Sequence, residues 1–301
     1  MDDSAFAELV EPHRRELLLH CYRMLGSRTE AEDALQETLL AAWRGLDGFE
    51  GRSSLRTWLY RIATTRCLNA RRGASRRVPA PVPPFEPPAP SRLGEVTWLQ
   101  AYPDALLDGV PDTAPGPAAR YEMREAVSLA FVTGLQRMPP RQAATLILRD
   151  VLGYTLSETA DLLGVTVTVV KGLLQRARAA QGEPAGAAEQ DRALVDRFAQ
   201  AFSARDLPAL LGLLTDDAWL SMPPAPHEYH GREAIAGFLA ASPTWRHALR
   251  LAETRANGQP AFACFLDEAP AGLMVLTLRG GRIGALTRFL QPGSLRDAGM
   301  L

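Results

Sequence analysis

Residues 49–77 read FEGRSSLRTWLYRIATTRCLNARRGASRR, and this stretch decides both the fold and the binding chemistry open to the chain. It contains eight arginines and one acidic residue, Glu50, in a chain whose formal net charge is −1. Its apolar residues recur at the spacing of one helix face: Leu55, Trp58, Leu59, Ile62 and Ala63. Ser53 or Ser54 can cap the first turn. The pattern predicts an amphipathic helix with a cationic outer side.

Several arginines of this helix fall outside the apolar stripe on an ideal helical wheel: Arg56, Arg61, Arg71 and Arg72. We expect their guanidinium groups to lie in solvent, where they can bind phosphate. Arg66 projects onto the stripe, so the pattern does not place it in solvent. The stretch therefore predicts a surface that suits phosphate binding.

The composition fits a multidomain globular protein. The 301 residues are 47% hydrophobic and 22% charged, which suffices for two or three compact domains and excludes disorder throughout. Residues 1–50 hold eleven acidic residues against five arginines. An acidic segment directly before a basic helix indicates two different binding partners.

Cysteine usage and hydropathy predict a cytoplasmic protein. Cys21, Cys67 and Cys264 are far apart and lack metal-ligand spacing, so we expect buried thiols in a reducing compartment. No apolar run approaches about 18 residues, and the N-terminus lacks the pattern of a signal peptide, so we expect no membrane segment. Neither a metal site nor a cofactor is expected.

Residues 5–46 show helical periodicity with one break, after which Ser27 or Thr29 can cap a second helix over residues 29–46. Acidic residues stand in its first turns: Glu30, Glu32 and Asp33. The helix dipole favours negative charge at that end. Two interpretations stay open, charge optimisation of a solvated face or a docking surface for a basic coiled coil.

Residues 79–117 contain eleven of the 23 prolines, and we expect a linker without regular elements. This segment also holds large apolar residues: Trp98, Leu99, Tyr102 and Leu106. A solvated linker gains nothing from exposing such side chains, so we expect them to dock on a neighbouring domain.

Helical patterning resumes at residue 118 and includes a helix-turn-helix. Thr155 or Ser157 can cap a short helix, Gly164 permits a tight turn, and a further helix is predicted over residues 166–180. Two short helices joined at a glycine turn make a helix-turn-helix, a shape that is compatible with DNA binding but not specific for it.

The remaining chain predicts an α+β domain. Helical segments after residue 190 are followed by alternating strands. Asn257-Gly258 and Gly280-Gly281 are the turn pairs of two β-hairpins.

These segments resemble one known family in the same order. Residues 20–72, beginning HCYRMLGSRTEAEDALQ, resemble region 2 of the extracytoplasmic-function (ECF) RNA polymerase sigma factors, and residues 138–178, beginning MPPRQAATLILRDVLGY, resemble their region 4. Residues 96–135 are similar to the sigma factor G-like subgroup, whose members carry a C-terminal SnoaL-like domain. LTDDAWLSMPP and ANGQPAFACFL resemble that domain.

The resemblance implies a multidomain fold with two all-α sigma-factor domains, a region 2 helical bundle and a region 4 helix-turn-helix, plus a C-terminal α+β SnoaL-like cone. The implied ranges are 1–78 for region 2, 79–117 for the Pro-rich linker, 118–181 for region 4 and 190–297 for the SnoaL-like domain.

The resemblance also implies a function, directing core RNA polymerase to promoter DNA under regulation by the SnoaL-like domain. The residues implied to face the β′ clamp helices of the polymerase are Glu32, Asp33, Gln36 and Glu37. Those implied in recognition and melting of the −10 element are Arg56, Trp58, Tyr60, Arg61, Thr65, Arg66, Asn69 and Arg72, although the helical pattern favours a core position for Trp58. Those implied at the −35 element are Thr166, Thr168, Lys171, Arg176 and Arg178.

Region 4 departs from the family pattern at several positions. Gly172 lies inside the second helix, where glycine costs about 0.5–1 kcal/mol relative to alanine. Leu173 replaces a phosphate-binding arginine, Thr159 an aliphatic core residue and Ala143 a basic residue. We expect weakened DNA binding.

These departures keep two alternatives open. In one, the sigma scaffold serves as an enzyme or small-molecule binder, an acid/base cyclase or isomerase for a polyketide-like substrate, with a small hydrophobic ligand in the cone. Its candidate residues are Asp217, His227, Tyr229, His230 and Asp267. A purely structural interpretation is also open, in which His227 and His230 are surface histidines on a loop and Asp216-Asp217 cap or end the preceding helix. The other alternative is a DNA-binding regulator that never joins polymerase.

Overall fold

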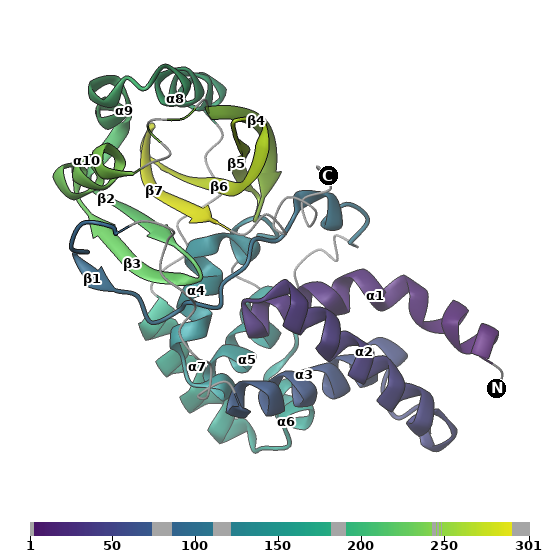
Figure 1. The fold of residues 1–301 in the computed structure, drawn as a ribbon. Helices are drawn as coiled ribbons and strands as arrows, with labels where there is room; N and C mark the ends of the chain where they lie inside the picture. The colour runs from purple at the N-terminus through teal and green to yellow at the C-terminus, as the bar shows by residue number, and fades with distance from the viewer. Residues whose placement is uncertain are drawn as a thin grey trace. The chain divides into compact units, whose positions relative to one another are not determined.

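The computed structural model describes residues 3–73, 86–110, 122–181, 191–242, 245, 247 and 249–290. The chain divides into two compact units, each built from two separate segments. The first unit comprises Met1–Arg77 and Leu106–Gly186, and the second comprises Val78–Ala105 and Ala187–Leu301. Part of the proline-rich stretch therefore belongs with the C-terminal domain (Figure 1).

The first unit begins with three helices, α1 (Asp3–Leu25), α2 (Arg28–Gly45) and α3 (Leu55–Gly73). Ser27 caps α2, because its hydroxyl accepts a hydrogen bond from the backbone N–H of Glu30 at 3.3 Å. Ser54 accepts in the same way from Thr57 at 3.1 Å at the start of α3. The predicted helices are confirmed. Of the proposed caps, Ser27 and Ser54 are confirmed.

The buried face of α3 differs from the predicted stripe. Its buried residues are Leu59, Tyr60, Ala63, Thr64 and Cys67. Leu55, Trp58 and Ile62 are only half-buried. The reason is that α3 packs against α1 and α2 and also against helices of the C-terminal half of this unit, so its covered face extends beyond one stripe. Trp58 lies at the margin, 5.0 Å from Phe49 between ring centroids.

The same unit continues with short helices, η4 (Glu125–Val127), α4 (Leu129–Arg137), α5 (Pro140–Leu146), η5 (Ile147–Val151), α6 (Leu156–Leu163) and α7 (Val167–Gln181). Thr155 and Glu158 form a capping box at the start of α6. Gly164 ends α6 with φ +62°, a conformation that favours glycine. The predicted helix-turn-helix of α6 and α7 is confirmed.

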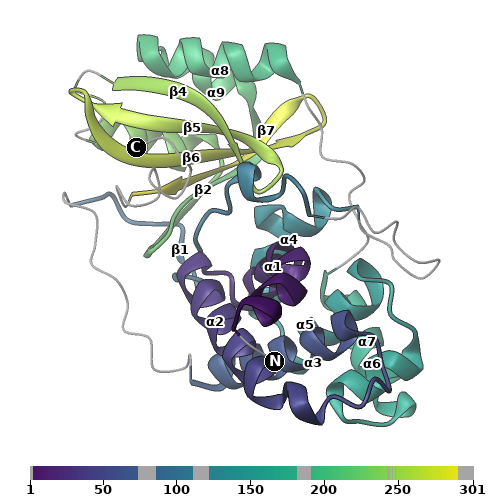
Figure 2. The same cartoon turned by 90° about the vertical axis from the view of Figure 1, so that its right-hand side faces the viewer.

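The second unit is an α+β domain with a curved mixed sheet. Its helices are α8 (Arg192–Ala204), α9 (Leu207–Leu213) and α10 (Arg232–Ala241). Its strands are β1 (Arg92–Leu93), β2 (Leu214–Met222), β3 (Ala225–His230), β4 (Leu249–Ala256), β5 (Gln259–Leu266), β6 (Ala269–Arg279) and β7 (Arg282–Phe289). Figure 2 shows α8 lying along the sheet.

The strands lie in the order β1-β3-β2-β7-β6-β5-β4, with β2 and β7 parallel and the other neighbours antiparallel. The β4–β5 and β6–β7 hairpins turn at the two predicted pairs, and Asn257 and Gly258 adopt positive φ of 58° and 69°. One face of the sheet and the three helices enclose a continuous apolar core that includes Phe198, Phe238 and Phe262.

Residues 88–104, here called the strap, correct the prediction of a linker without regular elements. β1 pairs with β3 through Arg92 and Glu228, and a short helix, η3 (Asp104–Leu106), follows. Leu99 and Tyr102 are buried, as expected of docking residues. Tyr102 and Asn257 exchange two hydrogen bonds of 2.8 and 2.7 Å, which fix the strap to the β4–β5 turn.

Two further expectations can be compared with the structure. Cys21, Cys67 and Cys264 are free and buried, as predicted. None of the described helices has the length and apolar character needed to cross a membrane.

Candidate polymerase and promoter interfaces

The acidic residues predicted to face a partner lie together on the outside of α2. Glu32, Asp33, Gln36 and Glu37 are all exposed, whereas Ala31, Ala34, Leu35 and Thr38 on the other side are buried. Arg28 donates a hydrogen bond to Glu32 at 2.9 Å, one turn away on the same helix. The face is open and mainly anionic, which suits a basic helical partner.

A second exposed row lies on α3. Arg61, Thr65, Asn69 and Arg72 follow one another at spacings of three or four residues, and all four are exposed. Thr65 donates to the carbonyl of Arg61 at 2.9 Å, and Arg72 donates to the side chain of Asn69. Four of the residues predicted for the −10 element thus form one polar, cationic ridge. Arg66 is half-buried.

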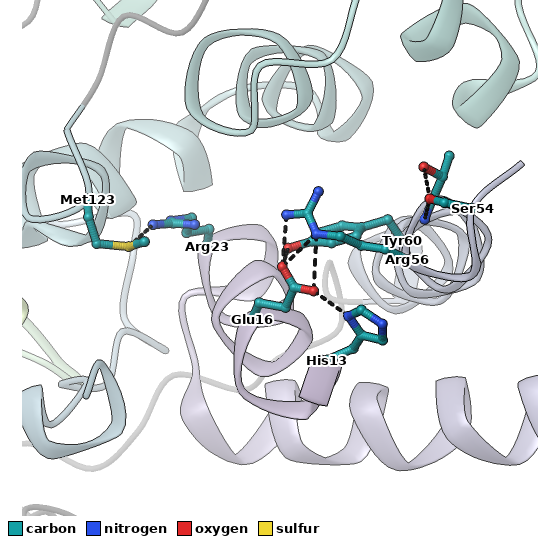
Figure 3. Close-up of polar contacts among 8 residues, drawn as sticks. His13, Glu16, Arg23, Ser54, Arg56, Tyr60 and Met123 are labelled. Atoms are coloured by element: carbon teal, nitrogen blue, oxygen red, sulfur yellow. Dashed lines mark hydrogen bonds and ion pairs between the residues drawn. The ribbon is translucent and has the colours of Figure 1, made fainter. Parts of the chain in front are cut away.

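Arg56 does not point freely into solvent, and that expectation is wrong. Figure 3 shows its guanidinium group turned toward Glu16 of α1. Arg56 Nε donates to Glu16 Oε2 at 2.8 Å and to Oε1 at 3.1 Å. The Glu16 side chain is only 5% exposed, and a buried carboxylate requires such a partner. The charge of Arg56 is neutralised within the fold.

Glu16 collects two further contacts, which makes it the centre of a small polar cluster (Figure 3). The Tyr60 hydroxyl donates to Glu16 Oε2 at 3.2 Å, and His13 Nδ1 lies 2.8 Å from Oε1. Arg56 also lies over the Tyr60 ring, with 4.8 Å between its Cζ atom and the ring centroid. Tyr60 is buried, and burial raises the pKa of its hydroxyl well above the ordinary value. Its ring is not exposed for stacking with a base.

Arg71 is also engaged, contrary to the expectation that it lies in solvent. One of its guanidinium nitrogens lies 3.2, 3.1 and 2.8 Å from the carbonyl oxygens of Leu135, Gln136 and Met138. These carbonyl groups lie at the end of α4, where the last turn of a helix lacks most of its intrahelical donors. Arg71 therefore caps α4.

His20 lies beneath α3 and is fully buried. Its Nε2 is 2.9 Å from the hydroxyl of Thr64. Burial, with the neighbouring charges of Arg23 and Arg56, lowers the pKa of His20 to about 3. The imidazole is therefore neutral at physiological pH.

On α7 the residues predicted for the −35 element divide into two groups. Thr166, Thr168, Lys171 and Arg176 are exposed, as a DNA-facing surface requires. Arg178 instead donates two hydrogen bonds to Asp150, with Nε–Oδ2 and Nη2–Oδ1 distances of 2.8 and 2.6 Å. The Asp150 side chain has no exposed surface. A fully buried carboxylate thus holds an arginine that the family resemblance assigned to DNA.

The departures from the family pattern in this region lie mostly inside the fold. Leu173 is 9% exposed and packs inward, and Ala143 is fully buried. Thr159 is buried as well, and no hydrogen-bond partner for its hydroxyl is found among the described residues. An unpaired buried hydroxyl costs about 1–3 kcal/mol. These positions bear on the stability of the domain more than on its surface.

Two of the enzymatic candidates are exposed carboxylates with cationic or imidazole partners. Asp217 pairs with Arg279 at the outer end of β6. Hydrogen bonds from Arg279 and Thr215 lower the pKa of Asp217, the opposite of what a general acid requires. Asp267, in the β5–β6 turn, lies 2.8 Å from His247 Nδ1.

The three remaining candidates lie on β3, beside the strap. Tyr229 is buried and donates its hydroxyl to the carbonyl of Pro88 at 2.8 Å. His230 is exposed and lies 4.3 Å from the Trp219 ring between centroids. His227 is paired with Leu93 of β1 in the strand register. The five candidates contribute to surface pairs and strap contacts and do not form a convergent acid/base group, so the enzymatic alternative is not favoured.

Sequence reasoning missed the buried carboxylates of Glu16 and Asp150. One signal was available, because apolar residues lie close to each in sequence, Leu17 and Leu19 after Glu16 and Leu146 and Ile147 before Asp150. Within the described part of the chain, no group of three or more potential ligand side chains is arranged to hold a metal ion.

Comparison with known families agrees with this architecture. Residues 9–77 match sigma-70 region 2, residues 128–180 match sigma-70 region 4, and residues 195–283 match the SnoaL-like domain. This order defines a sigma factor with an appended SnoaL-like domain.

Individual relatives narrow the class. ECF RNA polymerase sigma factor SigG of Mycobacterium tuberculosis is 42% identical over 305 residues, covering 95% of this chain and 81% of SigG. The probable ECF sigma factor SigI of the same organism is 28% identical, covering 94% of this chain and 92% of SigI. The crystal structure of M. tuberculosis SigJ shares the fold, with a TM-score of 0.64, 21% identity and full coverage of both chains. The chain belongs to the ECF sigma factor family, whose members bind core RNA polymerase and promoter DNA.

Proposed function

We propose a division of tasks among three surfaces of this sigma factor. The exposed face of α2 with Glu32, Asp33, Gln36 and Glu37 binds the clamp helices of the polymerase β′ subunit. The ridge on α3 with Arg61, Thr65, Asn69 and Arg72 contacts the −10 element while the strands separate. The exposed start of α7 binds the −35 element. The observation that carries the proposal is the separation of an exposed acidic face on α2 from an exposed cationic ridge on α3.

We assign Arg56 and Arg178 a different task from the one that the family pattern implies. Both are bound by buried carboxylates, so a contact with promoter phosphates would require each to break its ion pair. Arg66, Thr166, Thr168, Lys171 and Arg176 remain proposed DNA contacts.

The C-terminal domain, in this proposal, regulates transcription and includes the strap. The hydrogen bonds from Tyr229 to Pro88 and between Tyr102 and Asn257 support treating residues 88–104 as part of that domain and not as a free linker. A small hydrophobic ligand as the regulatory signal stays a prediction. Because core RNA polymerase works in the bacterial cytoplasm, we place the protein there.

The test uses the full chain with bacterial core RNA polymerase. Reversing charge on α2 with Asp33→Lys and Glu37→Lys should abolish capture of the polymerase. Reversing charge on α3 with Arg61→Glu and Arg72→Glu should leave capture intact and abolish run-off transcription. Glu233→Lys, an exposed acidic residue on α10, is the matched control and should change neither. Capture that survives the α2 reversal would refute the proposed polymerase face.

A further inference from the structure

The first turn of α7 exposes two apolar side chains. Val167 is 37% and Val169 is 44% exposed, and they are among the few large apolar side chains so exposed in the described residues. Thr166 and Thr168 beside them are exposed too, whereas Val170 is buried. The sequence Thr166–Val169 therefore presents a tip of methyl groups ahead of the first buried residue of the helix.

The chemistry of duplex DNA suggests what such a tip can recognise. In a helix-turn-helix, residues at the N-terminal end of the second helix reach the base edges in the major groove. The apolar group that the bases offer there is the C5-methyl group of thymine. Valine side chains at this place can bury against thymine methyl groups but cannot hydrogen-bond to guanine or adenine.

Charge complementarity favours DNA over an apolar protein partner. The helix α7 contains no acidic residue, and Lys171 and Arg176 are exposed on it. Cations flanking a methyl-rich tip suit phosphates on either side of a groove. A protein that covered the two valines would have to accept the same uncompensated positive charge.

The far end of α7 is fixed to the body of the domain. Arg178 lies eleven residues beyond Val167, roughly 16 Å along the helix axis. Its two hydrogen bonds to the fully buried Asp150 hold that end against η5. An anchor at one end leaves the exposed first turn with a defined direction.

We propose that Val167 and Val169 read thymine methyl groups in the −35 element, and that Arg178, held by Asp150, positions α7 without contacting DNA. This inference rests on the proposed role of α7 at the −35 element. It adds the base type that is read and the residues that read it.

The first experiment identifies the element and then removes single methyl groups. Holoenzyme made with the full chain selects duplexes from a library randomised upstream of the −10 position. Each enriched thymine is then replaced by deoxyuridine, which lacks only the methyl group. We expect about a fourfold loss of affinity at one or two adjacent positions, the factor given by exposing one methyl-sized apolar group. Failure to enrich any sequence would count against the proposed function itself.

Variants of the valines assign each methyl contact. Holoenzyme with Val169→Ala should bind the duplex with the affected thymine and the duplex with deoxyuridine equally tightly. Val169→Ile should restore the difference in affinity between the two duplexes. Val167→Ala should act in the same way at its own position. Leu93→Ala, which truncates an exposed apolar side chain in the other unit, should leave the fourfold effect unchanged. An enriched element without thymine, or deoxyuridine effects that persist in both alanine variants, would overturn the inference. If the alanine variants lost polymerase capture while the deoxyuridine effects stayed unchanged, the valines would contact the polymerase and not DNA, which would also overturn the inference.

The second experiment separates an anchor from a phosphate contact. The slope of log K against log salt concentration shrinks by about 0.9 for every DNA phosphate that the protein no longer neutralises. We expect that shrinkage for Lys171→Ala but not for Arg178→Ala. Asp150→Asn is decisive, because it would strengthen DNA binding if it released an arginine for phosphate and weaken binding if the pair is an anchor. A tighter complex with Asp150→Asn, or a smaller slope with Arg178→Ala, would overturn the assignment.

Discussion

The helices α3 and α7 differ in where they expose their polar residues, although both carry arginines that the family pattern assigns to DNA. On α3 the exposed residues form a ridge from Arg61 to Arg72, which spans more than half of the helix. On α7 the first turn exposes Thr168 between Val167 and Val169, and the exposed polar residues Lys171, Gln175 and Arg176 follow farther along the helix. A ridge of cations can follow a backbone over several nucleotides, whereas a tip of methyl groups can examine a few base edges. The surface of α3 therefore suits strand opening, and the surface of α7 suits reading of base sequence.

The two helices also share one feature, an arginine paired with a buried carboxylate, but the carboxylates differ in their surroundings. Each has an arginine held by a buried carboxylate from another helix, Arg56 by Glu16 and Arg178 by Asp150. Glu16 has the Tyr60 hydroxyl and His13 as additional partners. Asp150 is the more deeply buried of the two carboxylates. The same arginine substitution should therefore have unequal effects.

The largest effect is expected from Arg178→Ala. Loss of the guanidinium group leaves the Asp150 carboxylate without that partner in the interior and should lower the free energy of unfolding by about 3–5 kcal/mol. Arg56→Ala should cost less, about 1–3 kcal/mol, because the Glu16 carboxylate is the less deeply buried of the two. Urea unfolding followed by circular dichroism measures both. Equal losses in the two variants would contradict the proposed difference between the clusters.

A pH effect should distinguish the two regions. Between pH 6.5 and about 3 the unfolded chain binds a proton at His20 that the folded chain does not bind, because burial lowers the pKa of His20. The free energy of unfolding should therefore fall as pH falls through this range, by about 1.4 kcal/mol per pH unit for this group. Residues 122–181 contain no histidine, so this contribution belongs to the α1–α3 region.

The measurement compares His20→Asn with the parent chain at pH 7 and pH 5. The variant should lose part of the pH dependence. His230→Asn, which removes an exposed imidazole, is the control and should follow the parent chain. An unchanged pH dependence in His20→Asn would show that the buried imidazole does not govern stability in this range.

The smallest effect is expected from Gly172→Ala, inside α7. The helix α3 has no glycine before its last residue, so it offers no equivalent position. A Cβ atom at this position would meet a guanidinium nitrogen of Arg176 at 3.6 Å, an ordinary contact. Gly172→Ala should therefore raise the free energy of unfolding by about 0.5–1 kcal/mol. A thermal melt of the two chains tests this gain, and a destabilised variant would mean that α7 needs the glycine for another reason.

Local features of the fold could be predicted from the sequence, because each depends on residues close together in the chain. Ser27, Ser54 and Thr155 cap helices within three residues, and Gly164 closes its own turn. The same holds for the Asn257-Gly258 hairpin. Helical periodicity predicted the buried side of α2, whereas the choice of Glu32, Asp33, Gln36 and Glu37 as a partner-facing set came from the family resemblance.

The tertiary ion pairs could not be predicted in this way. Arg56 and Glu16 are 40 positions apart, and Arg178 and Asp150 are 28 apart. Helical periodicity places an arginine off the apolar stripe but does not reveal a carboxylate on another helix. The enzymatic candidates are not favoured for a related reason, since residue type suggested acid/base chemistry while the partners of Asp217 and Tyr229 are set by distant strands and the strap.

The hydrogen bonds between Tyr102 and Asn257 have a consequence for how the protein is made. Asn257 leaves the ribosome 155 residues after Tyr102, when regions 2 and 4 have already been synthesised. Until then, Tyr102 lacks the β4–β5 turn that holds it in the complete domain. The C-terminal domain is discontinuous in sequence, so a truncation after region 4 produces a chain with an orphaned apolar segment. A chain limited to regions 2 and 4 would require excision of residues 88–104 as well.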